Sequence, residues 1–182
     1  MKRILSLLVV VSFCFTQIVA QESTFEKGTK VLNLGVGLGS TLYSGIGNKM
    51  GIPPISASFE VGAVDNILEK GVIGVGGYLG YSSHRWEYLN YGWKYSNIII
   101  GGRGAFHYPL VDKLDTYTGL LLGYNIASSK EIGTPIGIAA SSGGIAWSWF
   151  LGARYYFKDT FGVFAELGYG IAYLTLGVSL KF

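Results

Sequence analysis

Hydrophobic and polar residues alternate with a period of two along most of this chain. In the first such run, Leu32 and Leu34 fall on one side, and Asn33 and Gly35 fall on the other. A period of two places successive side chains on opposite faces of a β-strand, whereas an amphipathic helix repeats its apolar positions every three to four residues. No helical period is sustained after Gln21. The sequence therefore predicts an all-β protein.

The alternation divides the chain into eight predicted strands. Their expected ranges are 30–43, 54–64, 71–83, 94–108, 116–128, 143–157, 161–170 and 173–182. Each range is close to or above the ~9–11 residues that a tilted strand needs to cross a bilayer. Short charged connections, at 65–70, 109–115 and 158–160, alternate with longer ones at 44–53, 84–93 and 129–142, and the connection at 170–172 is very tight. Short periplasmic turns, longer outer loops and an even strand number are typical of membrane β-barrels.

The two faces of the strands differ in chemistry. One face is apolar and carries no charge within the predicted spans, and the other face is small or polar. The glycines of the second face are Gly35, Gly37, Gly39, Gly74, Gly76, Gly80, Gly119, Gly123, Gly152, Gly168 and Gly177. Glycine weakens a strand interior, so the water-facing side of a soluble β-sandwich would carry few glycines, but a narrow eight-stranded barrel needs small residues inside. The pattern predicts a membrane-spanning, antiparallel, up-and-down β-barrel over residues 30–182, with an apolar exterior and a polar lumen.

The last strand, 173–182, carries a recognisable motif. Thr175, Gly177, Leu180 and the aromatic Phe182 resemble the C-terminal signal strand of bacterial outer-membrane β-barrels. The resemblance implies that the barrel-assembly machinery reads this strand during biogenesis.

The first twenty residues have the pattern of a signal peptide. Lys2 and Arg3 precede an apolar run at 4–15, and Ala20 offers a small residue for cleavage before Gln21. The run is too short for a transmembrane helix, which needs ~20 apolar residues. We expect residues 1–20 to be removed on export, and residues 21–29 to form a short periplasmic segment before the barrel.

Charge and cysteine content narrow the classes of function. Without Lys2 and Arg3, 12 basic residues remain against 11 acidic ones, a net charge of +1, and the basic residues are scattered along the sequence. We therefore expect no nucleic-acid partner. The single cysteine, Cys14, lies in the predicted signal peptide, and the two histidines have no metal-ligand spacing. We expect no metal and no cofactor.

The whole chain resembles the small outer-membrane β-barrels of the OmpA/OmpX type, which include short barrels common in Bacteroidota. The resemblance implies location in the bacterial outer membrane, in contact with its lipids. It does not fix the function, because such barrels include anchors, adhesins, small channels and a few lipid-modifying enzymes. The sequence favours a closed barrel with a structural or partner-binding role. A narrow channel is the alternative, and an enzyme is the least favoured of the three.

Four charged residues are predicted to point into the lumen: Glu60, Arg103, Arg154 and Glu166. An unpaired charge in a narrow lumen is costly, so we expect an internal Arg–Glu network that closes the barrel. The alternative is a ring of charges that lines a channel.

The outer connection at 84–93 is the best candidate for binding a partner. Arg85, Trp86, Tyr88, Tyr91 and Trp93 belong to residue types that are enriched at recognition hot spots. The alternative is that these rings cap the barrel mouth.

An enzyme would need a nucleophile, a base and an orienting acid at this rim. His84 lies in sequence beside Ser82, Ser83 and Glu87, without the His-x-Ser spacing of lipid deacylases. We expect no catalytic residues.

Overall fold

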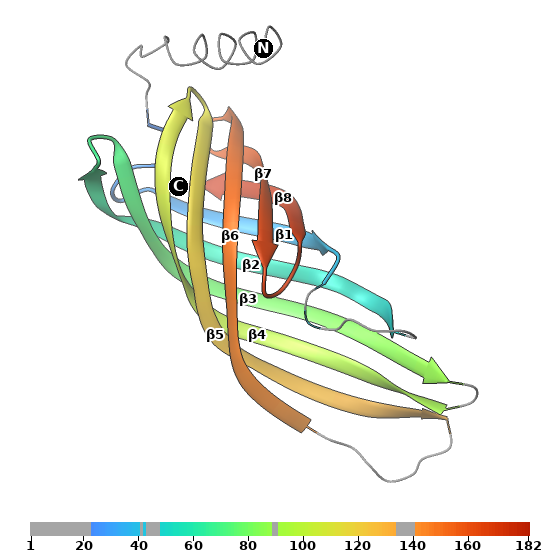
Figure 1. The fold of residues 1–182 in the computed structure, drawn as a ribbon. Coiled ribbons are helices and arrows are strands. Elements are labelled where there is room, and N and C mark those ends of the chain that lie inside the picture. The colour runs from blue at the N-terminus through green and yellow to red at the C-terminus, as the bar shows by residue number, and fades with distance from the viewer. Residues whose placement is uncertain (1–22, 41, 43–47, 89–90, 134–140) are drawn as a thin grey trace, which may run out of the picture.

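Eight antiparallel strands form a closed barrel in which each strand pairs with its neighbours in sequence and β1 pairs with β8 (Figure 1). The strands are β1 (Lys30–Leu38), β2 (Asn48–Ile67), β3 (Gly71–Tyr88), β4 (Tyr91–Val111), β5 (Leu114–Gly133), β6 (Ser141–Lys158), β7 (Phe161–Tyr169) and β8 (Leu174–Lys181). The computed structural model describes residues 23–40, 42, 48–88, 91–133 and 141–182. The predicted signal peptide, 1–20, lies outside the described residues.

The predicted all-β barrel, its strand number and its antiparallel order are confirmed. The predicted lengths of the outer loops are wrong. β3 and β4 pair as far as Tyr88 and Tyr91, and β4 and β5 pair as far as Gly133. Much of the expected loops at 84–93 and 129–142 is therefore strand. The outward side chains there are polar or charged, so the apolar-polar contrast that marks a half-buried strand is lost while the backbone pairing continues.

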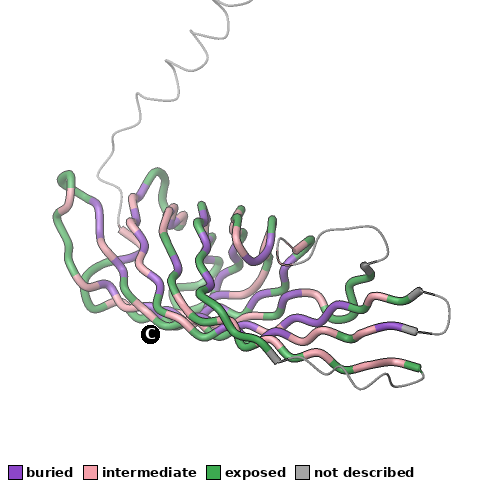
Figure 2. Tube along the Cα trace, turned by 60° about the horizontal axis from the view of Figure 1, so that its bottom comes forward, coloured by how far each residue is buried: buried purple, intermediate pink, exposed green. Residues whose placement is uncertain are grey.

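The exterior of the ring is apolar, as predicted. Buried and exposed positions alternate along the strands (Figure 2). The exposed apolar side chains include Leu34, Val36, Ile55, Phe59, Val75, Leu79, Ile98, Ile100, Leu120, Leu122, Leu151, Val163, Leu167 and Leu176. Aromatic side chains such as Tyr155, Phe161 and Tyr169 are also exposed on this surface, as in the aromatic girdles of membrane barrels. Among the described residues, no helix is long and apolar enough to cross a membrane.

Glycines allow the narrow ring to close. Gly177 of β8 lies opposite Gly35 of β1. A Cβ atom at Gly177 would collide with the carbonyl oxygen of Leu34 and would approach the Phe164 ring to 2.5 Å. Glycine at such lumenal positions therefore leaves room for aromatic rings and for the neighbouring backbone, as the sequence predicts for a small barrel.

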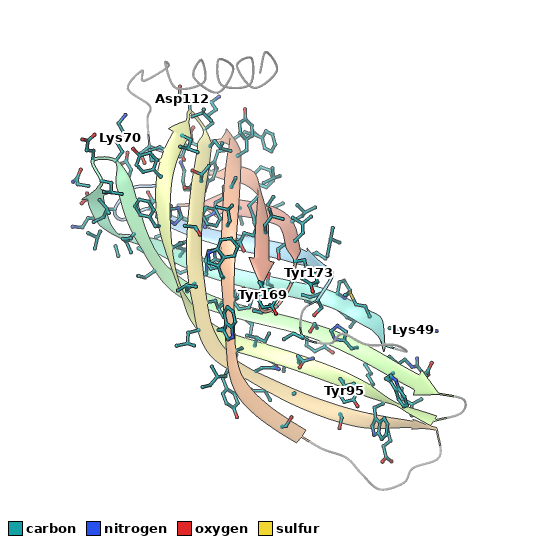
Figure 3. The ribbon with its side chains drawn as sticks, in the orientation of Figure 1. Lys49, Lys70, Tyr95, Asp112, Tyr169 and Tyr173 are labelled. Atoms are coloured by element: carbon teal, nitrogen blue, oxygen red, sulfur yellow. The ribbon has the colours of Figure 1, made fainter. Side chains whose placement is uncertain are left out.

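The barrel is much longer on one side than on the other. β2 to β6 extend beyond the short strands β1, β7 and β8 (Figure 1). We call the part of β2 to β6 beyond the short strands the extension. Lys49 and Tyr95 lie on the extension, whereas Tyr169 and Tyr173 flank the short β7–β8 connection (Figure 3). The opposite end carries the tight turns with Lys70 and Asp112 (Figure 3). Because membrane barrels have short turns on the periplasmic side, we take this end as the periplasmic end.

Candidate functional site

A buried cluster of four charged side chains occupies the periplasmic half of the lumen. Glu60 on β2, His107 on β4, Asp115 on β5 and Arg154 on β6 are each at most 2% exposed. Arg154 Nη1 donates to Asp115 Oδ2 at 2.8 Å, and Arg154 Nη2 donates to Glu60 Oε2. One guanidinium therefore bridges two carboxylates on different strands.

His107 joins the same two carboxylates from the other side. Its Nδ1 lies 2.9 Å from Asp115 Oδ1, and its Nε2 lies 2.9 Å from Glu60 Oε1. If both carboxylates are ionised, they offer only acceptors, so both ring nitrogens of His107 donate and the ring carries a positive charge. The cluster then holds two cations and two anions, which meets the need for compensation of a buried charge.

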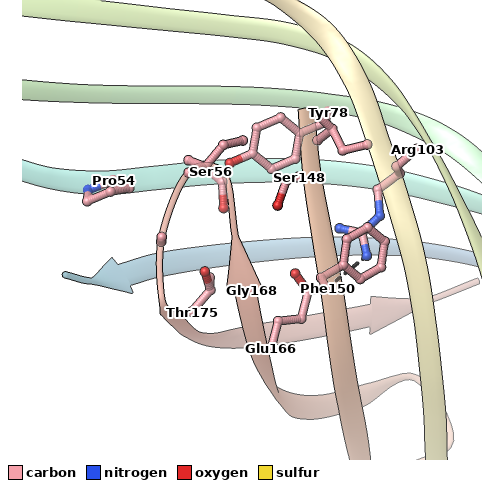
Figure 4. Close-up of a pocket in the computed structure, with 12 residues that line it drawn as sticks. Pro54, Ser56, Tyr78, Arg103, Ser148, Phe150, Glu166, Gly168 and Thr175 are labelled. Atoms are coloured by element: carbon pink, nitrogen blue, oxygen red, sulfur yellow. Dashed lines mark hydrogen bonds and ion pairs between the residues drawn. The ribbon is translucent and has the colours of Figure 1, made fainter. Parts of the chain in front are cut away.

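A second ion pair lies further toward the outer end of the lumen. Arg103 on β4 and Glu166 on β7 point toward one another, with Arg103 Nη2 2.8 Å from Glu166 Oε1 (Figure 4). Tyr117 donates its hydroxyl to the same carboxylate oxygen at 2.8 Å, and the Arg103 guanidinium lies 4.1 Å from the Phe150 ring centroid. The pair is thus held by hydrogen bonds to Glu166 and by the contact between Arg103 and the Phe150 ring.

The segment before β1 enters the periplasmic mouth of the barrel. Phe25 is 2% exposed and stacks on the His107 ring, with 3.9 Å between ring centroids. Backbone hydrogen bonds fix the segment, because Gly28 donates to the Gly62 carbonyl and Gly62 donates to the Thr29 carbonyl, each at 2.9 Å. We call residues 23–29 the N-terminal plug.

The β7–β8 connection packs against lumenal side chains at the outer end of the ring. Ile171 and Ala172 are buried, and Ile171 packs in an apolar cluster with Ile99, Leu121 and other lumenal residues. Between this cluster and the Arg103–Glu166 pair lies a cavity of about 30 Å³ (Figure 4). That volume suits about two water molecules. Side chains thus occupy the lumen at three levels. These are the four-residue charge cluster, the Arg103–Glu166 pair and the apolar cluster that contains Ile171.

The structure brings the four predicted lumenal charges together as two pairs, Glu60 with Arg154 and Arg103 with Glu166. Sequence reasoning missed the part played by Asp115, which was expected in a turn at 109–115. Asp115 lies instead on β5, opposite Arg154 of β6. The signal was available, because Asp115, Tyr117 and Gly119 continue one alternating face.

The predicted binding residues lie on a paired hairpin rather than in a loop. Trp86 and Trp93 are opposite each other on β3 and β4, with ring centroids 5.6 Å apart. Arg85 forms an exposed ion pair with Glu87 at 2.6 Å. The side chains of Tyr88 and Tyr91 lie outside the described residues.

The hairpin does not assemble the triad that an enzyme would need. On β3, Ser82 and His84 are buried on the lumenal face, whereas Glu87 lies on the opposite face with Arg85. Glu87 therefore does not orient His84. Within the described residues, no group of three His, Cys, Asp or Glu side chains converges as a metal site.

The four residues of the predicted assembly signal lie at the end of the barrel seam. Thr175, Gly177 and Leu180 pair with β1, and the Phe182 backbone nitrogen donates to the Lys30 carbonyl at 2.9 Å. Phe182 itself is 72% exposed, so its ring is accessible from the outside of the barrel.

Comparisons with known proteins identify the fold. No protein-family model and no curated protein matches the sequence. The N-terminal β-barrel domain of Pseudomonas aeruginosa OprF has a TM-score of 0.52 and 13% identity, covering 86% of this chain and 98% of that domain. Ail of Yersinia pestis, in complex with the heparin analogue sucrose octasulfate, has a TM-score of 0.51 and 12% identity, covering 85% of this chain and 96% of Ail. The chain therefore has the fold of the small eight-stranded outer-membrane β-barrels of the OmpA/OmpX type.

Proposed function

We propose that the protein is a closed outer-membrane barrel that has a structural role and presents its extension to partners outside the cell. Residues 1–20 direct export in this proposal, and the strand ending at Phe182 is read by the barrel-assembly machinery. No catalytic step is assigned to it.

The filled lumen carries the proposal. The Glu60–His107–Asp115–Arg154 cluster joins four strands across the barrel, and the N-terminal plug covers it on the periplasmic side. A conducting lumen needs a continuous wet path with sites that an ion can enter and leave. Charges that are buried and mutually compensated leave no such sites.

The extension supports the second half of the proposal. Its hairpin carries Trp86 and Trp93 side by side on the face opposite Arg85, and aromatic side chains are enriched at protein–protein hot spots. A paired hairpin is also more rigid than a loop, so less conformational entropy is lost when it binds.

Single-channel recording tests the closed lumen. The protein is refolded, its folding is verified by heat-modifiable migration on a gel, and the folded protein is inserted in a planar bilayer. We expect no discrete openings. Regular openings in the unaltered protein would refute a closed barrel and would favour the narrow channel.

Binding to host or bacterial surface proteins tests the extension. We expect Trp93→Ala to abolish the capture of a partner that the unaltered barrel retains, without changing the midpoint of urea unfolding. The matched control is Trp149→Ala on the membrane-facing side of β6, which should leave capture unchanged. Equal capture by both variants would contradict the proposed role of the hairpin.

A further inference from the structure

The strand register collects four cations that are scattered in the sequence. Lys49 pairs with Arg85, Arg85 pairs with Lys94, and Lys94 pairs with Lys130. Directly paired residues lie on the same face of a sheet, so the four side chains form one row across β2, β3, β4 and β5. We call these four residues the cationic row. The basic residues are scattered along the sequence, but the strand register brings these four together.

All four side chains are exposed and point away from the lumen. Arg85 continues the outward face of Leu79 and Tyr81 on β3, and Lys94 continues the outward face of Ile98 on β4. Lys49 projects from the extension in Figure 3. The row therefore lies on the same side of the sheet as the apolar belt and not on the side that faces the barrel axis.

The outward face changes in three steps toward the tip of the extension. Ile55, Tyr81, Ile98 and Ile126 form the last row that is wholly apolar. The next row holds Ile52 and the hydroxyls of Ser83, Ser96 and Ser128, and the cationic row follows. Two rows correspond to four residues, or about 13 Å along a strand. Along the strands, the order of apolar, hydroxyl and cationic side chains matches the order of acyl chains, interface and charged headgroups across a lipid leaflet.

The row has an electrostatic cost that folding does not require. Like charges directly opposite each other destabilise a sheet. Only one acidic side chain, Glu87, forms an ion pair with the row among the interactions of the described residues. Neighbouring strands are about 4.8 Å apart, so the row places four positive charges within about 15 Å. An extended anion with several charges offsets this repulsion.

We propose that the cationic row binds the phosphate groups of a glycolipid in the outer leaflet, of the lipopolysaccharide class. The position of the row favours a lipid over a soluble polyanion, because the cations adjoin the membrane side of the sheet at headgroup depth. Clusters of Lys and Arg beside a membrane are the usual means of recognising anionic headgroups. The proposal rests on the outer-membrane location but not on a closed lumen or on a protein partner.

The test measures binding of lipid A by the refolded full barrel in detergent micelles. Bisphosphorylated lipid A, its fully dephosphorylated form and soluble sucrose octasulfate serve as probes. We expect binding of the bisphosphorylated form only, or at least a tenfold preference for it. We expect Arg85→Gln with Lys94→Gln to weaken that binding by about tenfold, since each exposed ion pair supplies about a two- to fivefold gain.

Lys70→Gln is the matched control, because Lys70 is exposed in a periplasmic turn. It should bind as the unaltered protein does. Glu87→Gln should strengthen binding, because it frees Arg85 from its ion pair. Urea unfolding should show the double variant close to the unaltered barrel in stability, since it removes both the exposed Arg85–Glu87 ion pair and a like-charge pair.

Three results would each overturn the proposal. One is equal binding of phosphorylated and dephosphorylated lipid A. Another is an equal loss in Lys70→Gln and in the double variant. The third is binding of sucrose octasulfate alone, which would assign the row to a soluble polyanion. None of these results bears on the conductance of the lumen, so the two proposals fail separately.

Discussion

Replacing Arg154 by methionine tests the lumenal charge cluster most directly. Arg154 is completely buried, bridges Glu60 and Asp115, and lies 4.3 Å from the Tyr117 ring centroid. Methionine fills similar space without charge. The change leaves two buried carboxylates that share the single positive charge of His107. Removing one partner of a buried ion pair costs about 3–5 kcal/mol, and we expect Arg154→Met to lower the free energy of unfolding by that amount.

The same substitution at Arg85 is the matched control. Arg85 forms an ion pair of similar length with Glu87, but the two side chains are 49% and 39% exposed. Exposed pairs contribute at most about 1 kcal/mol. Equilibrium urea unfolding of both variants, refolded in lipid vesicles and followed by tryptophan fluorescence, gives the two losses. If Arg154→Met costs no more than Arg85→Met, the cluster does not stabilise the barrel.

A double variant separates charge balance from packing. Arg154→Met with Asp115→Asn leaves Glu60 and His107 as one ion pair without net charge. In the unaltered protein, Glu60 Oε1 and His107 Nε2 are 2.9 Å apart. We expect the double variant to be more stable than the sum of the two single losses predicts, because the two sites are in contact and couple. An additive result would mean that the loss in Arg154→Met comes from packing alone.

Three further perturbations test the plug, the lumenal glycines and the lipid face. Phe25→Ala should cost about 3 kcal/mol and should speed hydrogen exchange in the N-terminal plug while the strands stay protected. Gly177→Ala should prevent closure, whereas Gly77→Ala, with no atom within 4 Å of the added Cβ, should fold normally; heat-modifiable migration distinguishes the two. Leu120→Arg, on the exposed face of β5, should cost about 2–4 kcal/mol in vesicles, and Leu68→Arg in a turn should cost almost nothing by urea titration.

Local alternation was sufficient to predict the strands of the ring, their number and the sidedness of the barrel. The reason is physical, because a strand with lipid on one side and a narrow lumen on the other must alternate large apolar residues with glycines or polar groups. The same signal fails in the extension, where Arg85 and Lys94 lie beyond the apolar belt and the outward positions are no longer apolar. Strand length beyond the membrane is then set by backbone pairing, which composition does not reveal.

Contacts across the lumen depend on register, which local patterns do not encode. The sequence placed Glu60 and Arg154 inside, but their contact with each other and with Asp115 depends on how far each strand is shifted against the next. The N-terminal plug was not predicted for a different reason. Phe25 precedes the first strand and belongs to no periodic run, so only the folded mouth of the barrel reveals that it is buried.

The pairing of β1 with β8 has a consequence for how the protein folds. Eight residue pairs join these strands, from Val31 with Lys181 to Leu38 with Leu174. Bringing together segments that are separated by roughly 140 residues costs about 4 kcal/mol of chain entropy by the logarithmic law of loop closure. The hydrogen bonds between β1 and β8 offset that cost only when the two strands meet. The other strand pairs, in contrast, form between segments that are neighbours in the sequence. Sealing of this seam is therefore expected to be the late, slow step of assembly, and until then both edges of an eight-stranded sheet are open to other strands.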